Sequence, residues 1–155
     1  MAFECSMTLL GDNLKKWSYR NGKEYGSTIG IAAYPGVFIR RHTLEIKNLP
    51  DGNMNGVPYL KLNNCLTGRS EVTLPEERYT YLERGFAAIS VDCGGTSFFY
   101  PSGKYSGLEI AFDLYQMAEA EPSIFQDLGV SPGKIRDRLE ERAGCLTGAV
   151  RDGWQ

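Results

Sequence analysis

Short segments of β-favouring residues recur along the first 114 residues, with turn signals between them at spacings of about 8–12 residues. The early segments are FECSMTLL, KKWSYR, STIGIAAY and VFIRRHTLEI, separated by turn signals at GDN and at Pro35-Gly36. This spacing predicts a β-sandwich or a small barrel and disfavours a fold that alternates strands with helices. The stretch NLPDGNMNGVP at 48–58 is the richest in Gly, Pro, Asn and Asp, so we expect a loop there.

The alternation of apolar and polar residues sharpens after residue 58. YLKLNNC at 59–65 and RSEVTL at 69–74 are expected to be two strands joined by a turn at LTG. The strands expected next are RYTYL, FAAISVD, TSFFYP and LEIAFDL. The last two flank the turn-forming PSGKYSG, which predicts a well-marked strand pair late in the chain.

From Tyr115 onward the periodicity becomes helical. The segment SPGKIRDRLEERAG is expected to begin a helix with Ser131 as N-cap and Pro132 at the first helical position. A narrow apolar stripe follows at i, i+4 and i+8, formed by Ile135, Leu139 and Ala143. The stripe predicts contact with the outer wall of the barrel or with a partner helix. The final CLTGAVRDGWQ has no clear pattern and is expected to fray.

Size and charge limit the class of protein. The chain has 155 residues, 42% hydrophobic and 23% charged, which is typical of one folded globular domain. Its net charge of −2 disfavours nucleic-acid binding by this chain alone. No apolar run reaches the roughly 18 residues of a membrane span, and no export leader is visible. The four scattered cysteines, without a CxxC pair, are expected to be reduced thiols of a cytoplasmic protein.

Residue types for catalysis are scarce. His42 is the one histidine, so neither an imidazole-based metal site nor a Ser-His-Asp or Cys-His arrangement can be assembled. No spacing of carboxylates singles out an acid–base pair, and the glycines of CGG and SGKYSG match no phosphate-binding fingerprint. We therefore expect no metal, no cofactor and no enzymatic activity. His42, beside Arg40 and Arg41, is expected to be a partly exposed strand residue.

Two stretches resemble a branch of the AraC-type transcription regulators. LKLNNCLTGR is similar to that branch's L-E-I-N-x-C-x-x-G-R, and PSGKYSGLEIAFDL is similar to its P-x-G-x-Y-x-G-L-x-I-x-x-D-L. The tail PSIFQDLGVSPGKIRDRL resembles the helices that follow in that branch. The resemblance implies an N-terminal cupin-like sensor domain. Residues 1–114 would form a double-stranded β-helix or jelly-roll barrel closed by the late strand pair, and residues 115–155 would form short C-terminal helices.

The resemblance also implies partners. AraC-type regulators carry a paired helix-turn-helix domain after the sensor, and this chain ends before one, so we expect a truncation; a stand-alone cupin is the alternative. The implied partners are a small-molecule effector and a second protomer, which would dimerise through the C-terminal helices at Ile135 and Leu139. DNA would be bound only through the missing domain, and no membrane partner is expected.

A small barrel either fills its interior or holds one small ligand, and nine Tyr, seven Phe and two Trp are enough to line such a cavity. Polar candidates share strand faces: Tyr59, Lys61 and Asn63 on one, and Arg69, Glu71 and Thr73 on the next. If these faces point inward, Arg69 would clamp an anionic group and Asn63 would orient the ligand.

The alternative is that these polar faces meet solvent. Leu60, Leu62, Val72 and Leu74 would then form the core, and burial statistics favour that arrangement. The same alternative applies to Glu109 and Asp113, which alternate with apolar residues.

Trp17 is a candidate ligand cap, because in the resembled family the segment before the barrel can fold over the pocket mouth. An ordinary core or edge aromatic is the alternative.

Three functions follow from these observations. The first is the effector-binding and dimerisation domain of an AraC-type regulator, which relays occupancy to the missing domain. The second is a stand-alone metal-free cupin enzyme acting on a sugar or small acid. The third is a β-sandwich interaction module without a ligand.

Overall fold

The computed structural model of the chain describes residues 3–50, 59–74, 78–91, 97–119, 122–141 and 145–149. A mostly β fold followed by short helices is confirmed. The strands are β1 (Glu4–Leu9), β2 (Leu14–Asn21), β3 (Glu24–Tyr34), β4 (Val37–Glu45), β5 (Asn48–Pro50), β6 (Tyr59–Leu74), β7 (Arg78–Glu83), β8 (Phe86–Val91), β9 (Ser97–Phe99), β10 (Tyr105–Asp113) and β11 (Cys145–Ala149). The helices are α1 (Leu114–Glu119), α2 (Ser123–Asp127) and α3 (Pro132–Glu140).

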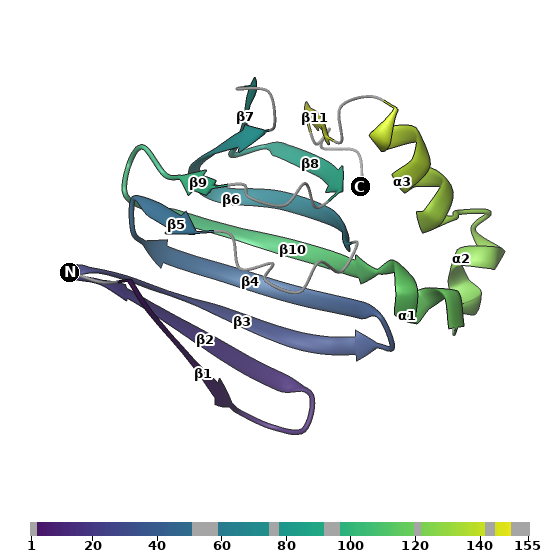
Figure 1. Ribbon diagram of the computed structural model, residues 1–155, viewed down its shortest axis with the longest axis horizontal. Coiled ribbons are helices and arrows are strands. Elements are labelled where there is room, and N and C mark those ends of the chain that lie inside the picture. The colour runs from purple at the N-terminus through teal and green to yellow at the C-terminus, as the bar shows by residue number, and fades with distance from the viewer. Residues whose placement is uncertain are drawn as a thin grey trace.

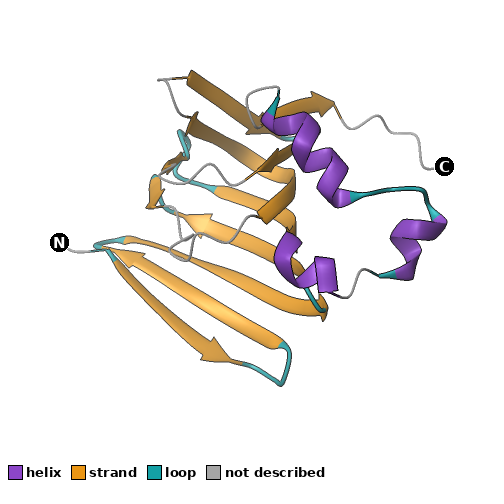
Figure 2. Cartoon of the chain, turned by 45° about the vertical axis from the view of Figure 1, so that its right-hand side comes forward, coloured by secondary structure: helices purple, strands orange, loops and turns teal. Residues whose placement is uncertain are grey.

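A large antiparallel sheet has the strand order β1-β2-β3-β4-β10-β6-β8-β11 (Figure 1). It curls into a half-barrel, and the helices lie together beside one end of it (Figure 2). The late strand β10 pairs with β4 on one side and with β6 on the other. β10 is therefore an inner strand of the sheet, which places its residues beside those of two strands from earlier in the chain.

A smaller second layer covers one end of this sheet. It contains β5, β7 and β9, which pair with one another or with the second half of β6. Figure 1 shows β5 and β9 at the end of the sheet opposite the helices.

β6 is one continuous strand from Tyr59 to Leu74, so the expected turn at LTG is wrong. Its first half pairs with β8 and β10, and its second half pairs with β7. The change of layer occurs at Gly68, whose φ is +82°. A Cβ there would collide with the backbone carbonyl oxygen of Lys104. Glycine thus lets the strand bend where a turn was expected.

Three other expectations need correction. The late segments β9 and β10 do not pair with each other; β9 belongs to the small layer and β10 to the large sheet. The start of the expected loop at 48–58 is the short strand β5, and the rest of that loop lies outside the described residues, as does CGG at 93–95. The C-terminal segment expected to fray includes β11, which pairs with β8 and returns the chain to the large sheet.

The apolar core fills the space between the two layers. Its buried members are Leu44, Ile46, Cys65, Leu82, Ala88, Tyr100 and Tyr105. The rings of Tyr100 and Tyr105 lie 5.0 Å apart, and burial raises the pKa of both phenols. The large sheet therefore has a concave face that this core covers at one end only.

The helical segment packs against its own sheet. Ser131 caps α3 and accepts a hydrogen bond from the Lys134 backbone N–H at 3.4 Å, as expected. Leu139 on α3 is only 2% exposed within the single chain, whereas Ile135 is half-buried. Leu139 is thus buried within its own chain, and Ala143 lies outside the described residues. Dimerisation through Ile135 and Leu139 stays a prediction. Within the described residues, α3 contacts β8 and β11 of its own sheet.

Candidate ligand-binding site on the concave face

The alternation along β10 identifies the two faces of the large sheet. Its buried residues are Tyr105, Gly107, Glu109, Ala111 and Asp113. Tyr105 belongs to the core between the layers, so this set lies on the concave face. Leu108, on the convex face, is 41% exposed. The polar residues of β10 therefore point inward, against the arrangement that burial statistics favoured.

Glu109 forms an ion pair with Arg40 of β4 on this concave face. The Arg40 Nη1 atom lies 2.7 Å from Glu109 Oε1, and both side chains are largely buried. Burial raises the pKa of the Glu109 carboxyl, but His42, when protonated, and the cations Arg40 and Lys61 lower it below its ordinary value. Glu109 is therefore held as a carboxylate inside the half-barrel.

Aromatic rings stand beside these charges. The Arg40 guanidinium lies 5.8 Å from the centroid of Phe38 and 5.9 Å from that of Tyr59. Lys61 Nζ lies 6.0 Å from the Tyr59 centroid, within the range of a cation–π interaction. Phe38 and Tyr59 meet edge to face. Strands β4 and β6 thus place an aromatic wall next to two cations.

Trp17 of β2 lies on the same face, above Gly30 of β3. A Cβ added to Gly30 would come within 2.8 Å of Trp17 Cζ3 and 3.2 Å of Arg40 Cγ. Only a residue without a side chain lets the indole lie this close to the sheet and beside the Arg40 stem. Trp17 and Arg40 are therefore neighbours across Gly30.

A chain of hydrogen bonds leads to His42 of β4. The Tyr19 hydroxyl donates to Thr28 Oγ1 at 3.1 Å, and Thr28 Oγ1 lies 2.9 Å from His42 Nδ1. Because Thr28 accepts from Tyr19, its own proton is available for Nδ1, and the neutral ring then carries its proton on Nε2. His42 Nε2 is buried and has no hydrogen-bond partner among the residues that the structure describes.

His42 is held neutral. Burial lowers its pKa, and the charges of Arg40 and Lys61 lower it further, while Glu109 opposes them. A buried N–H without an acceptor is costly, so Nε2 is a donor suited to an oxygen of a bound molecule. His42 is the partly exposed strand residue that the sequence predicts, although its Nε2 atom is buried.

Three of the residues predicted from sequence come together on this face: Trp17, Tyr59 and Asn63. Asn63 of β6 is directly opposite Glu109 of β10 in the strand register. The side chains on this face that we group as the concave site are Trp17, Tyr19, Thr28, Phe38, Arg40, His42, Tyr59, Lys61, Asn63 and Glu109.

Arg69 and Glu71 lie elsewhere. They are on the half of β6 that pairs with β7. There Arg69 pairs with Glu71 at 2.9 Å and lies over the Tyr81 ring at 4.2 Å, and both charged side chains are partly exposed. The bend at Gly68 lies between Asn63 and Arg69, so the two residues are on different halves of β6 with different partner strands. Their expected use as an anion clamp stays a prediction.

Sequence reasoning assigned no role to Arg40, His42 or Glu109. The available signal was the alternation in RRHT and LEIAFD, which places Arg40 with His42 and Glu109 with Asp113 on single strand faces. The identity of the inward face could not be read from alternation, because it depends on which layer covers the sheet.

The strand that carries Glu109 runs directly into the helices. Asp113, the last residue of β10, is buried and accepts hydrogen bonds from the backbone N–H groups of Tyr115 and Gln116 at 3.0 and 3.1 Å. Its other carboxylate oxygen accepts from Gln116 Nε2 at 2.8 Å. Three residues therefore separate Glu109 of the buried ion pair from Asp113, the cap of α1.

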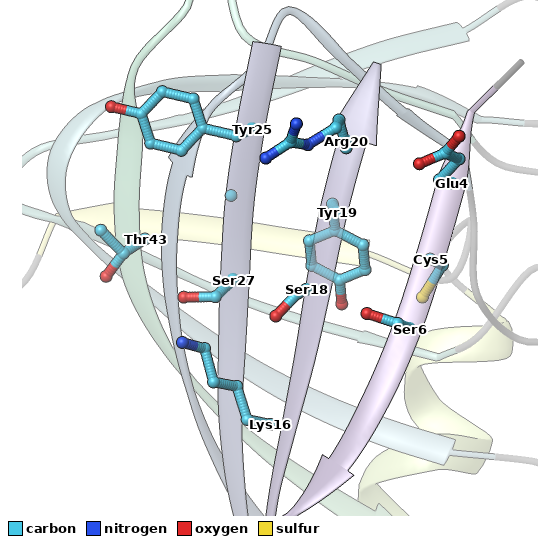
Figure 3. Close-up of a pocket in the computed structure, with 11 residues that line it drawn as sticks. Glu4, Cys5, Ser6, Lys16, Ser18, Tyr19, Arg20, Tyr25, Ser27 and Thr43 are labelled. Atoms are coloured by element: carbon cyan, nitrogen blue, oxygen red, sulfur yellow. The ribbon is translucent and has the colours of Figure 1, made fainter. Parts of the chain in front are cut away.

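A second hollow, of about 750 Å³, lies over β1 to β4, and Tyr19 is the one residue of the concave site among those that line it. It is lined by side chains of the convex surface of β1 to β4, among them Lys16, Ser18, Ser27 and Thr43 (Figure 3). Its polar side chains are partly or fully exposed. We favour the concave site because it contains the buried side chains of Thr28 and Glu109 and the buried Nε2 atom of His42, and perturbed, buried polar groups are typical of a ligand site.

Two other kinds of feature are absent from the described residues. No cluster of three or more His, Cys, Asp and Glu residues suited to a metal ion occurs there. No helix among them is both long and apolar enough to cross a membrane.

No protein-family model matches the chain, and no curated protein matches its sequence. Solved structures similar to it include the AraC-like transcriptional activator CuxR, at 10% identity and a TM-score of 0.49, with 63% of this chain and 36% of CuxR covered. An RmlC-like cupin from Desulfovibrio desulfuricans is similar at 13% identity and a TM-score of 0.45, covering 57% of this chain and 82% of that protein. A putative ethanolamine utilization protein Q from Salmonella typhimurium is similar at 12% identity and a TM-score of 0.47, covering 73% and 98%. These likenesses concern the curled β-sheet and say nothing of a ligand.

Proposed function

We propose that this chain is a cupin-type sensor domain that binds a small molecule in the concave site and relays its presence through the C-terminal helices. The observation that carries the proposal is the buried Nε2 of His42, without a hydrogen-bond partner among the described residues, on the same face as the buried Arg40–Glu109 pair. Buried polar groups are normally satisfied, and a ligand oxygen is the partner that this face lacks.

The walls of the concave site suit a small molecule with one apolar face and several oxygens. Trp17, Phe38 and Tyr59 offer ring surfaces, while His42 and Arg40 offer N–H donors. Ligand sites commonly combine such apolar walls with a few fixed polar groups.

A route for the relay exists along β10. Glu109 meets the ligand site, and Asp113 on the same strand caps α1. Suppose that the chain has two conformations that differ in the position of Glu109, and with it in the position of β10 and α1. A ligand that binds one conformation more tightly shifts the equilibrium toward that conformation, by an amount set by the difference in affinity. The sequence resemblance to AraC-type regulators supports a regulatory use of this route, with DNA bound by a domain outside this chain.

The proposal is tested by thermal denaturation of the chain with a panel of sugars, sugar acids and small aromatic acids. A compound of the right class stabilises the wild type in a concentration-dependent way, because it binds only the folded state. Trp17→Ala and His42→Ala should reduce the stabilisation. The matched control is Tyr81→Ala on β7, an exposed aromatic outside the concave site, which should leave it unchanged.

A metal-free enzyme is a second candidate, favoured by one observation. Glu109 and His42 are two buried titratable groups close enough for each to shift the pKa of the other. Incubating each stabilising compound with the chain and analysing it by mass spectrometry separates the two functions. An unchanged compound supports the sensor, and conversion that Glu109→Gln abolishes supports the enzyme.

A further inference from the structure

Tyr19, at the start of the hydrogen-bond chain that leads to His42, is held in place by its own surroundings. Its ring stacks on that of Phe3, with the centroids 6.1 Å apart and the ring planes inclined by 26°. Burial raises the pKa of its phenol, so the hydroxyl keeps its proton at neutral pH. The Tyr19 hydroxyl therefore remains a donor, and it donates to Thr28 Oγ1 at 3.1 Å.

Thr28 stands between Tyr19 and His42 and is only 2% exposed. A threonine hydroxyl has a single proton to donate. Because Thr28 Oγ1 accepts from Tyr19, its own proton is directed toward its other neighbour, His42 Nδ1, at 2.9 Å. Thr28 of β3 is directly opposite His42 of β4 in the strand register, so the sheet itself holds the two side chains together. Tyr19 and Thr28 thus decide which nitrogen of His42 carries the proton.

With its proton on Nε2, His42 adds a donor to a face that already carries others. Arg40, two residues earlier on the same face of β4, has five N–H groups, and its Nη1 donates to Glu109 at 2.7 Å. Lys61 adds an ammonium group, which has no acceptor capacity. Glu109 is the one carboxylate of the concave site, and it is already paired with Arg40. A molecule that matches these donors offers acceptor oxygens, and a carboxylate or a carbonyl group supplies them without a competing donor.

We infer that Tyr19 sets the ligand class of the concave site: it fixes the His42 proton on Nε2, so the site selects a molecule with a carboxylate or carbonyl oxygen. The ligand class rests on the proposed function, whereas the position of the proton is a property of the chain alone. Tyr19 acts through Thr28 and His42, so it is a positioning residue. Without the Tyr19 proton, Thr28 Oγ1 can accept from an Nδ1–H instead, and Nε2 then becomes an acceptor that suits a donor of the ligand.

Nuclear magnetic resonance of the isotope-labelled chain at neutral pH locates the proton, because the chain has one histidine. The wild type should carry it on Nε2. Tyr19→Phe keeps the stacked ring and should lower the ratio of the Nε2–H form to the Nδ1–H form by about fivefold, the effect of one neutral hydrogen bond. The matched control is Tyr79→Phe on β7, a tyrosine that is 76% exposed and lies outside the concave site. An unchanged ratio in Tyr19→Phe would overturn the inference.

The ligand class is tested with benzoate and benzamidine, two planar probes of the same shape. Benzoate offers only acceptors where benzamidine offers only donors. Thermal denaturation should show that the wild type binds benzoate more tightly than benzamidine. Tyr19→Phe should lower the ratio of the two affinities by about fivefold, and Tyr79→Phe should keep the wild-type ratio. Neither substitution changes the charge of the site at neutral pH, so the ratio reports the proton on His42.

A wild type that binds benzamidine at least as tightly as benzoate, or that binds neither probe, would overturn the ligand class. The sensor function would still stand if another compound stabilised the wild type and did so less in His42→Ala. If no compound did, the proposed function would fail as well. The failure of the ligand class and the failure of the proposed function are therefore distinguishable.

Discussion

Glu109 of β10 and Arg40 of β4 occupy directly paired positions of adjacent strands, and their side chains meet at 2.7 Å on the concave face. Glu109 is 8% exposed, so its carboxylate has exchanged most of its water for one guanidinium. The pair thereby joins the strand that leads into α1 to the strand that carries His42.

Removing one partner of this pair should be costly. Arg40→Met leaves the Glu109 carboxylate buried without its cation, and we expect a loss of about 3 kcal/mol in the free energy of unfolding. The double variant Arg40→Met, Glu109→Met should recover most of that loss, because no buried charge is left unpaired. Urea denaturation followed by circular dichroism measures both.

The comparison variant is Glu71→Gln, which breaks the more exposed Arg69–Glu71 pair on the second half of β6. It should change the free energy of unfolding by no more than about 1 kcal/mol. If Arg40→Met and Glu71→Gln lower the free energy of unfolding equally, the Arg40–Glu109 pair is solvated and the expectation is wrong.

The pH dependence of stability should reveal the buried His42. Its pKa is lowered by burial, so the folded chain resists a proton that the unfolded chain accepts below about pH 6.5. The contribution of His42 to the free energy of unfolding is therefore fully present above about pH 6.5. It decreases as the pH falls from that value toward the lowered pKa of the folded chain. His42→Gln should remove this part of the pH dependence in melting experiments from pH 8 to pH 5.

Because the chain has one histidine, its imidazole resonances are assigned without ambiguity. Nuclear magnetic resonance should find a titration midpoint below the ordinary value and a proton on Nε2 at neutral pH. A midpoint at or above 6.5 would contradict the burial of the ring.

Gly30 should not tolerate a methyl group. Gly30→Ala would push a Cβ against Trp17 Cζ3, and we expect a loss of about 1–3 kcal/mol together with a displaced indole. Fluorescence in a Trp154→Phe background reports Trp17 alone. Gly148→Ala is the control, since an added Cβ there meets nothing within 4 Å. Unaltered emission and stability in Gly30→Ala would place Trp17 away from Gly30.

Leu139 should act in folding rather than in dimerisation. Leu139→Ala is expected to cost about 2–4 kcal/mol, because the side chain is buried within the chain. Ile135→Ala, on the same stripe but half-buried, should cost less. Chemical denaturation at fixed protein concentration measures both. A Leu139→Ala chain of undiminished stability that dissociates where the wild type is a dimer would instead support the dimer seam at α3.

The strands themselves were predictable because their turns and alternation are local properties. VFIRRHTLEI and LEIAFDL became β4 and β10 with nearly the expected bounds. The partners of β10 were not predictable, because strand pairing joins residues far apart in sequence, such as Arg40 and Glu109. The bend at Gly68 was mistaken for a turn because both use a glycine with positive φ.

The candidate site was half predictable. Tyr59 and Asn63 were named for their strand face and Trp17 from the family resemblance, and the concave site contains all three. Arg40, His42 and Glu109 were passed over because a polar face was assigned to solvent. In this fold Ile39 and Leu62 on the aliphatic face are 40% and 38% exposed, whereas Leu60 on the same face is buried, as expected for a core residue.

Native mass spectrometry tests the central claim most directly. The purified chain is incubated with the small-molecule fraction of a cell extract, desalted and weighed intact. We expect the wild type to gain the mass of a small molecule, smaller than that of a peptide. Trp17→Ala and His42→Ala should bind less of this molecule, and Tyr81→Ala should bind as much as the wild type. A wild type that gains no mass, or an adduct held equally by all three variants, would contradict a ligand on the concave face.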